Sequence, residues 1–517
     1  MLMAIDAGTG SARAVLFEAD GTEIAAAQEE WHHLEDPRYP GSSDFDIATN
    51  WALICRCIRK VMAISGRKAE DVVAISATSM REAFVAYDDS GTEIWACANV
   101  DSRASSEVRE LTQSKPHLQS QLYEISGQTF ALATLPRLLW LKRNMPGVFA
   151  RVSRISMLSD WILARLSGEL FSDPSNAGTT GLLSLKTRDW NRQALELLEM
   201  PSDVLPPIVE PGSVIGKLTR KAAAETDLLP STLIVAGGGD CQIGSVGLNL
   251  VREGDCAVLG GTFWQQLVNV SDGLRDPAMD LRINPHAIAG LNQAEAISFF
   301  VGSAMRWFRD SFGQEELRNA GGDPSRAYSL LEALTVDIPA GSYGILPILS
   351  DVMHYGRWYH AAPSLLNLSL DPARSGKGAI FKALQENAAI VASLNLHRVF
   401  ALAKHTPDRV VFASGAAKSE RWCQILSDVT GLAVVVPKVT EATALGGAAA
   451  ASVGAGLYDN LCEASSAMVR TERDYQPNRS LAGVYDDVRE RWRIAYASQL
   501  ALVDQGVTTS MWKAPGL

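Results

Sequence analysis

Apolar and polar residues alternate over the N-terminal part of the chain in a way that predicts a small sheet covered by one long helix. Short apolar runs at Met3–Ile5, Ala14–Glu18 and Glu23–Gln28 are separated by turns rich in glycine and aspartate, as in a three-stranded meander. A helix is expected next, capped by Asp44 or Asp46. Its apolar positions recur with the helical period at Ile47, Trp51, Ile54, Cys55, Ile58 and Met62.

A short buried strand is then expected at Val72–Ala77, where apolar and small residues form a continuous run. Met80-Arg-Glu82 follows just beyond its carboxyl end, the edge of an open α/β sheet at which ligands bind. Ala83–Tyr87 and Glu93–Cys97 flank a turn rich in aspartate and form a predicted hairpin that returns to the same edge.

The strand-then-glycine pattern recurs after a helix-rich region at residues 102–230. Leu233–Ala236 is a predicted strand that leads into Gly237-Gly-Gly-Asp240, and Cys256–Leu259 is another that leads into Gly260-Gly-Thr262. The pattern therefore predicts two similar α/β halves that meet at a cleft.

We place the two predicted halves at residues 1–248 and 249–517. The second half is expected to close with a helix at Glu420–Gly431, a strand at Val434–Pro437 and a helix rich in alanine and glycine after Glu441. Small residues in that last helix permit a close approach of another backbone.

Composition narrows the class of protein. The chain has 517 residues and a net charge of −11, which argues against a nucleic-acid partner. The longest uncharged run, Ala442–Leu457, is mostly alanine and glycine and too weakly apolar to span a bilayer. An acid follows the N-terminus too soon for a signal peptide, and seven scattered cysteines are typical of reduced thiols. A cytoplasmic protein with a small-molecule substrate is therefore expected.

The first glycine turn carries candidate chemistry. Thr9, Gly10, Ser11 and Arg13 could hold the phosphates of a nucleotide, although an ordinary hairpin turn explains the same residues equally well. The echo at Gly261-Thr262 favours the phosphate interpretation, because phosphoryl transfer is catalysed by positioning and charge neutralisation from several loops.

Three acids and one arginine are further candidates. Asp6, at a strand end, is either a turn former or a magnesium ligand that acts through water, and its place beside a phosphate loop favours the metal. Asp240 is either a helix N-cap or a general base that takes the proton of an attacking hydroxyl, and we favour the base. Arg81 and Glu82 are either a solvated strand end or a clamp on a polyol or carbonyl; the residues alone leave this open.

No zinc site is expected, because His32, His33, His286, His354 and His360 do not have ligand spacing.

Taken in order, these motifs resemble those of the FGGY carbohydrate kinases, a family of the actin-like ATPase superfamily. The resemblance covers nearly the whole chain. Its markers are Asp6–Arg13, Ser79–Glu82, Asn99–Arg103, Ser175–Gly178, Gly237–Asp240, Gly260–Thr262, Gly302–Trp307, Ser414–Ser419 and Glu441–Gly446. The resemblance implies two actin-like (ribonuclease H-like) α/β domains facing a central cleft, with ATP and Mg²⁺ bound between them.

Within the family, several segments look most like the autoinducer-2 kinases. They are Trp95–Asp101, Asp173–Leu182, Leu259–Gln266, Trp358–Pro363 and Thr508–Leu517. This likeness implies ATP-dependent phosphorylation of 4,5-dihydroxypentane-2,3-dione on its terminal hydroxyl. It also implies regulation by a carrier protein of the sugar phosphotransferase system, although no residue indicates the docking surface.

Carried over position by position, the resemblance assigns roles to individual residues. Asp240 matches the general base, and Arg81, Glu82 and Gln242 match the substrate clamp. The phosphate contacts match Thr9, Gly10, Ser11, Arg13, Gly261 and Thr262, with Asp6 at the metal. The contacts to the adenosine match Gly302, Gly415, Ala416 and Glu420.

The chain departs from the family pattern at four positions. Ser414 and Ala416 replace the outer two glycines of the adenosine loop, so only its central glycine remains. Met80 replaces a glutamine before the clamp, and Arg306 replaces a glutamine that some members have on the adenosine side. These changes suggest altered contacts rather than lost activity. The alternatives are a kinase of a ketopentose or deoxyketose, or a non-catalytic actin-like sensor of sugar or nucleotide, against which the retention of Asp240 argues.

Overall fold

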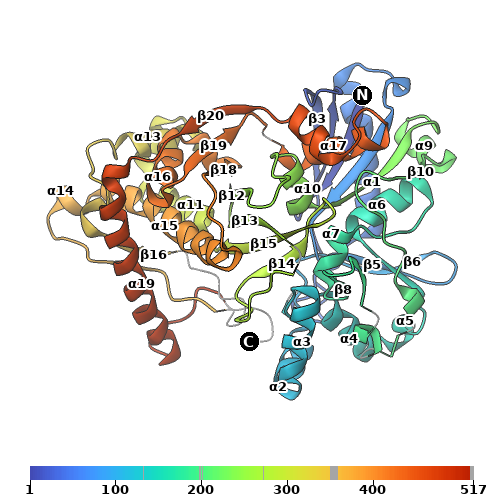
Figure 1. Cartoon of the computed structure of the whole chain (residues 1–517), viewed down its shortest axis with the longest axis horizontal. Helices are drawn as coiled ribbons and strands as arrows, with labels where there is room; N and C mark the ends of the chain where they lie inside the picture. The colour runs from blue at the N-terminus through green and yellow to red at the C-terminus, as the bar shows by residue number, and fades with distance from the viewer. Residues whose placement is uncertain are drawn as a thin grey trace.

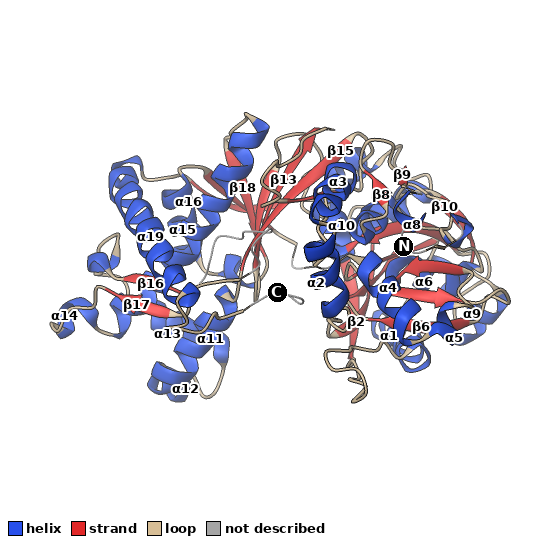
Figure 2. Ribbon diagram, turned by 90° about the horizontal axis from the view of Figure 1, so that it is seen from below, coloured by secondary structure: helices blue, strands red, loops and turns tan. Residues whose placement is uncertain are grey.

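The computed structural model describes residues 1–131, 133–191, 193–196, 199–200, 202–271, 273–349, 359–439 and 441–512 of the chain. The elements gather in two lobes, which Figures 1 and 2 show from two sides. Each lobe is built on one mixed sheet with helices against it.

The first sheet has six strands, all from the N-terminal half of the chain. Its order is β10-β11-β4-β1-β2-β3, in which β1, β2 and β3 are antiparallel neighbours and β1, β4 and β11 are parallel neighbours. The strands are β1 (Leu2–Ala7), β2 (Ser11–Phe17), β3 (Glu23–Glu30), β4 (Ala74–Ser79), β10 (Val214–Lys217) and β11 (Leu233–Gly239). The predicted meander is confirmed as β1, β2 and β3.

The second sheet has seven strands from the C-terminal half, in the order β14-β15-β13-β12-β18-β19-β20. They are β12 (Cys256–Gly260), β13 (Trp264–Ser271), β14 (Arg282–Pro285), β15 (Leu291–Ser298), β18 (Arg409–Ala413), β19 (Ala433–Pro437) and β20 (Thr471–Tyr475). From β15 to β19, chain order and strand directions repeat those from β3 to β11. The prediction of two similar halves is therefore confirmed at the level of topology.

Three smaller sheets are separate from the two main sheets. They pair β5 (Phe84–Tyr87) with β6 (Glu93–Cys97) and β7 (Arg154–Met157), β8 (Leu183–Ser184) with β9 (Asp189–Trp190), and β16 (Leu346–Ile348) with β17 (Ser364–Leu366). The pair of β5 and β6 is the hairpin that the sequence predicted.

Both halves of the chain contain helices, and some of them pack on the main sheets. In the N-terminal half they are α1 (Ile47–Ser65), α2 (Ser105–Ser114), α3 (Pro116–Ser126), α4 (Thr134–Asn144), α5 (Pro146–Phe149), α6 (Leu158–Ser167), α7 (Pro174–Ala177), α8 (Gln193–Glu196), α9 (Arg220–Thr226) and α10 (Asp240–Val246). In the C-terminal half they are α11 (Val301–Phe312), α12 (Gln314–Asn319), α13 (Pro324–Ala333), α14 (Pro372–Ser375), α15 (Lys377–Ala403), α16 (Glu420–Thr430), α17 (Ala442–Gly454), α18 (Leu461–Met468) and α19 (Ala482–Asp504). Of the two predicted caps of α1, the structure has Asp46, which accepts a hydrogen bond from the Thr49 amide at 3.0 Å.

Two helices connect the lobes. The helix α10 directly follows β11 of the first sheet, whereas α17 follows β19 of the second sheet but packs on β1, β4 and β11 of the first. The two helices cross each other, and Figure 1 shows them side by side at the junction of the lobes. Residues 442–454 therefore return to the first lobe, and the division into residues 1–248 and 249–517 stays a prediction.

Two strand predictions need correction at their ends. The strand expected at Val72–Ala77 is β4, Ala74–Ser79, because Leu2 pairs with Ala74 and the ladder continues through buried Thr78 and Ser79. The strand expected to end at Ala236 continues to Gly239 as part of β11. A Cβ on Gly237 would lie 1.9 Å from the carbonyl oxygen of Ala77, so only glycine lets this strand approach β4 so closely.

In the part of the chain that the structure describes, no helix has both the length and the apolar character needed to cross a bilayer.

Candidate functional site

Hydrogen bonds from side chains to its carbonyl groups hold the turn between β1 and β2, while its outer residues are exposed. The Trp31 indole N–H donates to the carbonyl oxygens of Gly8 and Thr9, at 3.1 Å each, and His33 Nε2 donates to the Thr9 carbonyl at 2.7 Å. Asn99 Nδ2 donates to the Thr9 hydroxyl at 3.0 Å. Thr9 and Gly10 are themselves exposed. The loop is thus fixed by its backbone while its outer surface stays available to a ligand.

Asp6 lies at the base of this turn in an electronegative surrounding. Burial raises its pKa to about 7, the charges of Asp240 and Glu441 add to the rise, and Arg13 opposes it. Arg13 forms an ion pair with Glu441 and donates to Gln28 Oε1 at 2.7 Å. A bound cation would relieve the repulsion that Asp240 and Glu441 exert on Asp6.

The donor set around Asp6 fits magnesium better than a transition metal. Among the described residues, no cluster of three or more histidine, cysteine, aspartate or glutamate side chains has the arrangement of a metal site. Mg²⁺ needs no such cluster, because it keeps several waters and takes one or two carboxylates together with substrate phosphates. A lone Asp6 beside a phosphate turn meets that requirement.

The second glycine turn and the adenosine loop meet through close backbone contacts. A Cβ on Gly302 would lie 2.6 Å from the Gly261 carbonyl oxygen, and the Gly302 amide donates to the Thr262 carbonyl at 3.0 Å. A Cβ on Gly260 would lie 2.6 Å from the side chain of Ala416. The structure therefore brings together the predicted nucleotide residues 260–262, 302 and 415–416, from β12, α11 and the segment after β18.

Glu420 does not point into this group of residues. It is the first residue of α16, and its side chain is 79% exposed, with Arg473 Nη1 3.9 Å away. The cap of the helix is Ser419, whose hydroxyl accepts a hydrogen bond from the Trp422 amide at 3.0 Å. An adenosine contact by Glu420 stays a prediction.

Asp240 stands at the first turn of α10 with its carboxylate partly open to solvent. The N-cap of the helix is Gly239, so the alternative of Asp240 as a capping residue is wrong. Its Oδ1 accepts from the Cys241 amide at 2.7 Å, and its side chain is 36% exposed. Burial of part of the group raises the pKa of Asp240, whereas the charge of Arg81 lowers it. A carboxylate of raised proton affinity in this position suits a general base.

Each of the three predicted clamp residues already has a polar contact to another protein group. Arg81 donates from Nη1 and Nη2 to Glu295 at 2.5 and 2.8 Å, and its Nε lies 3.5 Å from Asp240 Oδ1. Glu82 has a left-handed backbone, with φ of 64°, and pairs with Arg282. Gln242 is fully buried and donates to Gln293 at 3.1 Å. The clamp is a buried network in which both halves of the chain take part.

A second buried network supports the backbone just before Asp240. Ser175 Oγ accepts from the Gly239 amide at 3.0 Å and donates to Asp173. Asp173 also caps α7 through the amides of Ser175 and Asn176. Burial raises the pKa of Asp173 to about 6 and that of neighbouring Asp160 well above its ordinary value. Asp173 and Ser175 therefore hold the glycine turn that precedes Asp240.

The sequence did not single out Glu295 and Arg282. Both lie far from the clamp in sequence, on β15 and β14, where they are directly opposite each other in the antiparallel register. The one available signal was the pattern: Glu295 is an isolated acid between Ala294 and Ala296 in a strand that is otherwise small, apolar or amide. Such an acid in a buried strand requires a partner.

The C-terminal segment packs against Phe299, the residue that directly follows β15. Trp512 stacks on Phe299 with ring centroids 4.7 Å apart, and the His360 ring lies 4.6 Å from Phe299. Ala131, from the other half of the chain, packs on the same cluster. Residues 350–358 and 513–517 lie outside the described residues, so His354 and parts of the segments Trp358–Pro363 and Thr508–Leu517 are not described.

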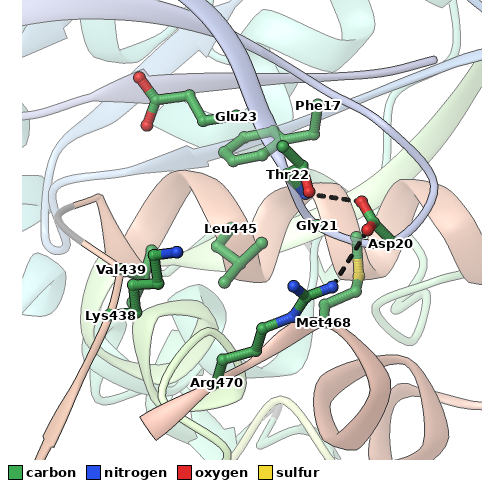
Figure 3. A pocket seen from close by; sticks show the side chains of 10 residues that line it. All are labelled: Phe17, Asp20, Gly21, Thr22, Glu23, Lys438, Val439, Leu445, Met468 and Arg470. Carbon is green, nitrogen blue, oxygen red and sulfur yellow. Dashed lines mark hydrogen bonds and ion pairs between the residues drawn. The ribbon is translucent and has the colours of Figure 1, made fainter. Parts of the chain in front are cut away.

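A separate pocket of about 270 Å³ lies where the β2–β3 hairpin meets the segments that flank α17 and α18. Figure 3 shows Asp20 between the Thr22 amide and Arg470, with Lys438 and Glu23 farther along the wall. None of the predicted site residues lines it. It lies at the Phe17 end of β2, roughly 20 Å along the strand from Ser11 at the phosphate turn. The pocket is therefore not part of the candidate site.

Comparison with known proteins agrees with this arrangement. Residues 1–247 match the model of the FGGY family of carbohydrate kinases, N-terminal domain, and residues 277–455 match that of its C-terminal domain. Autoinducer-2 kinases from Salmonella choleraesuis and Yersinia pseudotuberculosis are each 52% identical over 517 residues, which is 100% of this chain and 98% of each relative. The enzyme of that name from Klebsiella pneumoniae is 50% identical over 100% of this chain and 97% of its own.

Solved structures support the fold. A xylulose kinase from Lactobacillus acidophilus superposes with a TM-score of 0.85 at 20% identity, covering 97% of this chain and 99% of that one. Plasmodium falciparum glycerol kinase with ADP gives a TM-score of 0.81 at 18% identity, covering 96% and 98%. The predicted fold class, two actin-like α/β domains facing a central cleft, is confirmed. The chain belongs to the FGGY family of carbohydrate kinases.

Proposed function

We propose that this chain is an ATP-dependent kinase that phosphorylates autoinducer-2, as open-chain 4,5-dihydroxypentane-2,3-dione, on its terminal hydroxyl. The observation that carries the proposal is an identity of 52% over the whole chain with relatives named autoinducer-2 kinase. The geometry supports a transfer to a hydroxyl, because the partly exposed carboxylate of Asp240 acts on Asp6 before the first glycine turn, and the next residue, Cys241, contacts Gln265 after the second.

Asp240 is the proposed base. Its carboxylate accepts the proton of the acceptor hydroxyl as the hydroxyl oxygen attacks the γ-phosphorus, and the leaving oxygen stays on ADP. The buried Asp173–Ser175–Gly239 contacts hold the turn that carries it. Arg81, Glu82 and Gln242 are the proposed contacts to the oxygens of the dione; because these groups are buried and fixed, they are pre-oriented before the acceptor arrives.

The nucleotide is proposed to lie between the two glycine turns. Thr9, Gly10, Ser11 and Arg13 on one side and Gly261 and Thr262 on the other are the phosphate contacts. Thr9, Gly10, Gly261 and Thr262 are exposed residues, which suits this role. Gly302, Gly415, Ala416 and Glu420 are the proposed adenosine contacts. The narrow approach between Gly302 and Gly261 explains why a glycine is needed at position 302.

Asp6 is the proposed holder of Mg²⁺, through the water shell of the ion. When bound, the ion supplies charge neutralisation for the phosphates. The remaining charges of the site belong to the protein: Arg13 is kept in place by Glu441 and Gln28, and its guanidinium faces the turn from the β2 side.

A phosphotransferase-system carrier protein is a further proposal, which only the resemblance supports, as is a cytoplasmic location. Adding purified carrier protein to the kinase assay tests the first of these. Regulation predicts a change in kcat or KM that saturates with carrier concentration, and constant kinetics at high concentration would reject it.

The test of the function is ATP consumption by the purified protein with dihydroxypentanedione, xylulose, ribulose, rhamnulose and glycerol as separate acceptors. Turnover with the dione alone is expected. Preference for a pentulose would keep the site and the chemistry but reject the proposed substrate. Tight nucleotide binding without turnover of any acceptor would favour a sensor.

The base is tested in the same assay with Asp240→Asn. The amide cannot take a proton, so the rate should fall by about 10²–10⁴-fold. Thermal unfolding should be nearly unchanged, because the side chain is partly exposed. Asp337→Asn, which neutralises an exposed acid elsewhere in the C-terminal half, is the matched control and should keep full turnover. Near-normal turnover by Asp240→Asn would remove Asp240 from the role of base.

A further inference from the structure

The carboxylate of Glu295 is completely surrounded by donors. Arg81 donates to both of its oxygens, at 2.5 and 2.8 Å, Asn284 Nδ2 lies 3.3 Å from Oε2, and Gln265 Nε2 lies 3.5 Å from Oε1. The side chain has no exposed surface. A bidentate pair of this kind fixes the plane of the guanidinium as well as its position.

This pair determines which part of Arg81 faces the base. With both Nη atoms bound to Glu295, the side of the guanidinium turned toward Asp240 is Nε, at 3.5 Å from Oδ1. That distance is longer than a charge-assisted hydrogen bond, so Asp240 lies near a positive charge without forming a hydrogen bond to it. If Arg81 lost its counter-charge, its free Nη atoms would be expected to turn to Asp240, the next nearest carboxylate.

A second ion pair holds the same hairpin against the clamp. Arg282 pairs with Glu82, and its Nε donates to Gln128 Oε1 at 2.7 Å, while Gln128 Nε2 donates to Asn284 at 2.9 Å. Arg282 and Glu295 are opposite each other on β14 and β15. One hairpin therefore supplies the partner of Arg81 and the partner of Glu82. Each of the two ion pairs joins a residue of the N-terminal half to a residue of the C-terminal half.

We propose that Glu295 is a positioning residue for phosphoryl transfer: it restrains Arg81 by both Nη atoms and thereby keeps Asp240 free to act as the base. The proposal rests on the proposed function of Asp240. It extends that function, because it makes the base dependent on a residue of the other half of the chain. In this proposal Glu295 acts on the site through Arg81, and Arg282 through Glu82.

The kinetic test compares Glu295→Gln with Arg282→Gln, using whichever acceptor the wild type phosphorylates. The first variant should lose about 10- to 100-fold in kcat with little change in the KM for ATP, since a misplaced group costs rate rather than nucleotide binding. The second should mainly raise the KM for the acceptor, because it releases Glu82 and leaves Arg81 in place. Glu295→Asp, which keeps the charge, should recover part of kcat. Equal effects of the two glutamine variants would mean that the pairs only hold the halves together, and would overturn the proposal.

A double-mutant cycle checks that the effect passes through Arg81. In Arg81→Gln/Glu295→Gln neither charge is left alone in the interior, so this variant should fold even where the single variant is weakened. Its kcat should match that of Arg81→Gln within about threefold, because a residue that acts through Arg81 has nothing left to position. Effects that multiply would overturn the proposal.

A crystal structure of Glu295→Gln gives an answer that does not depend on the substrate. The Arg81 guanidinium should turn so that an Nη atom lies within hydrogen-bond distance of Asp240. An unchanged guanidinium would overturn the positioning role. If the wild type phosphorylates none of the acceptors, the proposed function fails, yet this structural result still decides whether Glu295 orients Arg81.

Discussion

Ser414 is the residue at which the chain departs most visibly from the family pattern, and the structure shows what the departure costs. Its backbone has φ of 74° and ψ of −166°, a region that is almost exclusive to glycine. The loop has thus kept a glycine conformation after the glycine was replaced. The conformation leaves Gly415 and Ala416 beside Gly260, so the strain is retained where the proposed adenosine contacts meet the second glycine turn.

Ser414→Gly should therefore stabilise the protein. Relief of a strained backbone of this kind is worth about 1–3 kcal/mol, from which the greater freedom of glycine in the unfolded chain subtracts roughly 0.5–1 kcal/mol. A net gain of about 1 kcal/mol in the free energy of unfolding is expected, with an unchanged KM for ATP. Urea unfolding measures the first and initial rates the second.

Ser414→Ala is the matched control for this prediction. It removes the hydroxyl but keeps the Cβ that causes the strain, so it should not stabilise the protein. Stabilisation by alanine as large as by glycine would show that the hydroxyl, rather than the backbone, is the unfavourable feature.

At the scale of single residues, the sequence indicated the groups that stand at strand ends but not their partners. Thr9 and Thr262 lie in turns marked by glycine and Asp240 directly follows a strand, as the pattern predicted, whereas Asp6 lies inside β1, one residue before its end. Glu295 was not predicted as the partner of Arg81, because the two are 214 residues apart and nothing local requires their contact. Contacts of that kind follow from the packing of two sheets, which periodicity does not describe.

Among the elements, β14 and the turn that follows it carry a titratable group in the interior. His286 is fully buried, its Nδ1 accepts from the Ile288 amide at 3.0 Å, and its carbonyl accepts from Arg188 at 2.7 Å. Burial, with the charge of Arg188, lowers the pKa of His286 to about 3. The imidazole is therefore neutral in the folded protein over the whole range in which an exposed histidine would gain a proton.

This turn makes stability depend on pH in one direction. The unfolded chain binds a proton at His286 near pH 6.5 and the folded chain does not, so stability is complete above that pH and falls as the pH drops toward 3. At pH 5 the loss from this group is about 2 kcal/mol, from roughly 1.5 pH units at 1.36 kcal/mol each. Urea unfolding at pH 7.5 and pH 5 measures it.

His286→Asn isolates the contribution of this residue. The asparagine side chain can still accept from the Ile288 amide but cannot titrate, so the variant should lose less stability on acidification than the wild type. His117→Asn, at an exposed position in α3, should behave as the wild type does. Equal acid losses in the wild type and in His286→Asn would place the pH dependence elsewhere.

The elements themselves were largely predictable, and the errors have a common physical cause. The sequence pattern predicts strand ends at Ala77 and Ala236, because polar and glycine residues follow them, whereas the strands continue to Ser79 and Gly239. In the structure Thr78, Ser79 and Gly238 are buried, and β4 and β11 pair at these positions. A polar or glycine residue that would end a strand at the protein surface can continue the strand where other elements cover it.

At the scale of the whole molecule, the crossing of α10 and α17 determines how the two lobes are joined. The helix α10 begins with the proposed base, and α17 comes from the second half of the chain but packs on the first sheet. The predicted closeness at the alanine- and glycine-rich helix is confirmed: a Cβ on Gly446 would lie 1.9 Å from the Ile243 carbonyl oxygen, and one on Gly247 would lie 1.8 Å from that of Ala442. Backbone meets backbone at this crossing, and neither atom can move aside alone.

The same substitution at two helical glycines should therefore have opposite effects. Gly446→Ala forces α17 away from α10, which should lower the free energy of unfolding by about 1–3 kcal/mol. It should also reduce kcat about tenfold, because the displacement is passed to Asp240 at the start of α10. Gly483→Ala, in α19, meets nothing within 4 Å of the new Cβ. It should raise stability by up to about 1 kcal/mol, since alanine favours the helix, and leave kcat unchanged. Urea unfolding and initial rates on both variants measure the contrast. If Gly446→Ala lost stability but kept full kcat, the crossing would hold the lobes together without determining the position of the base.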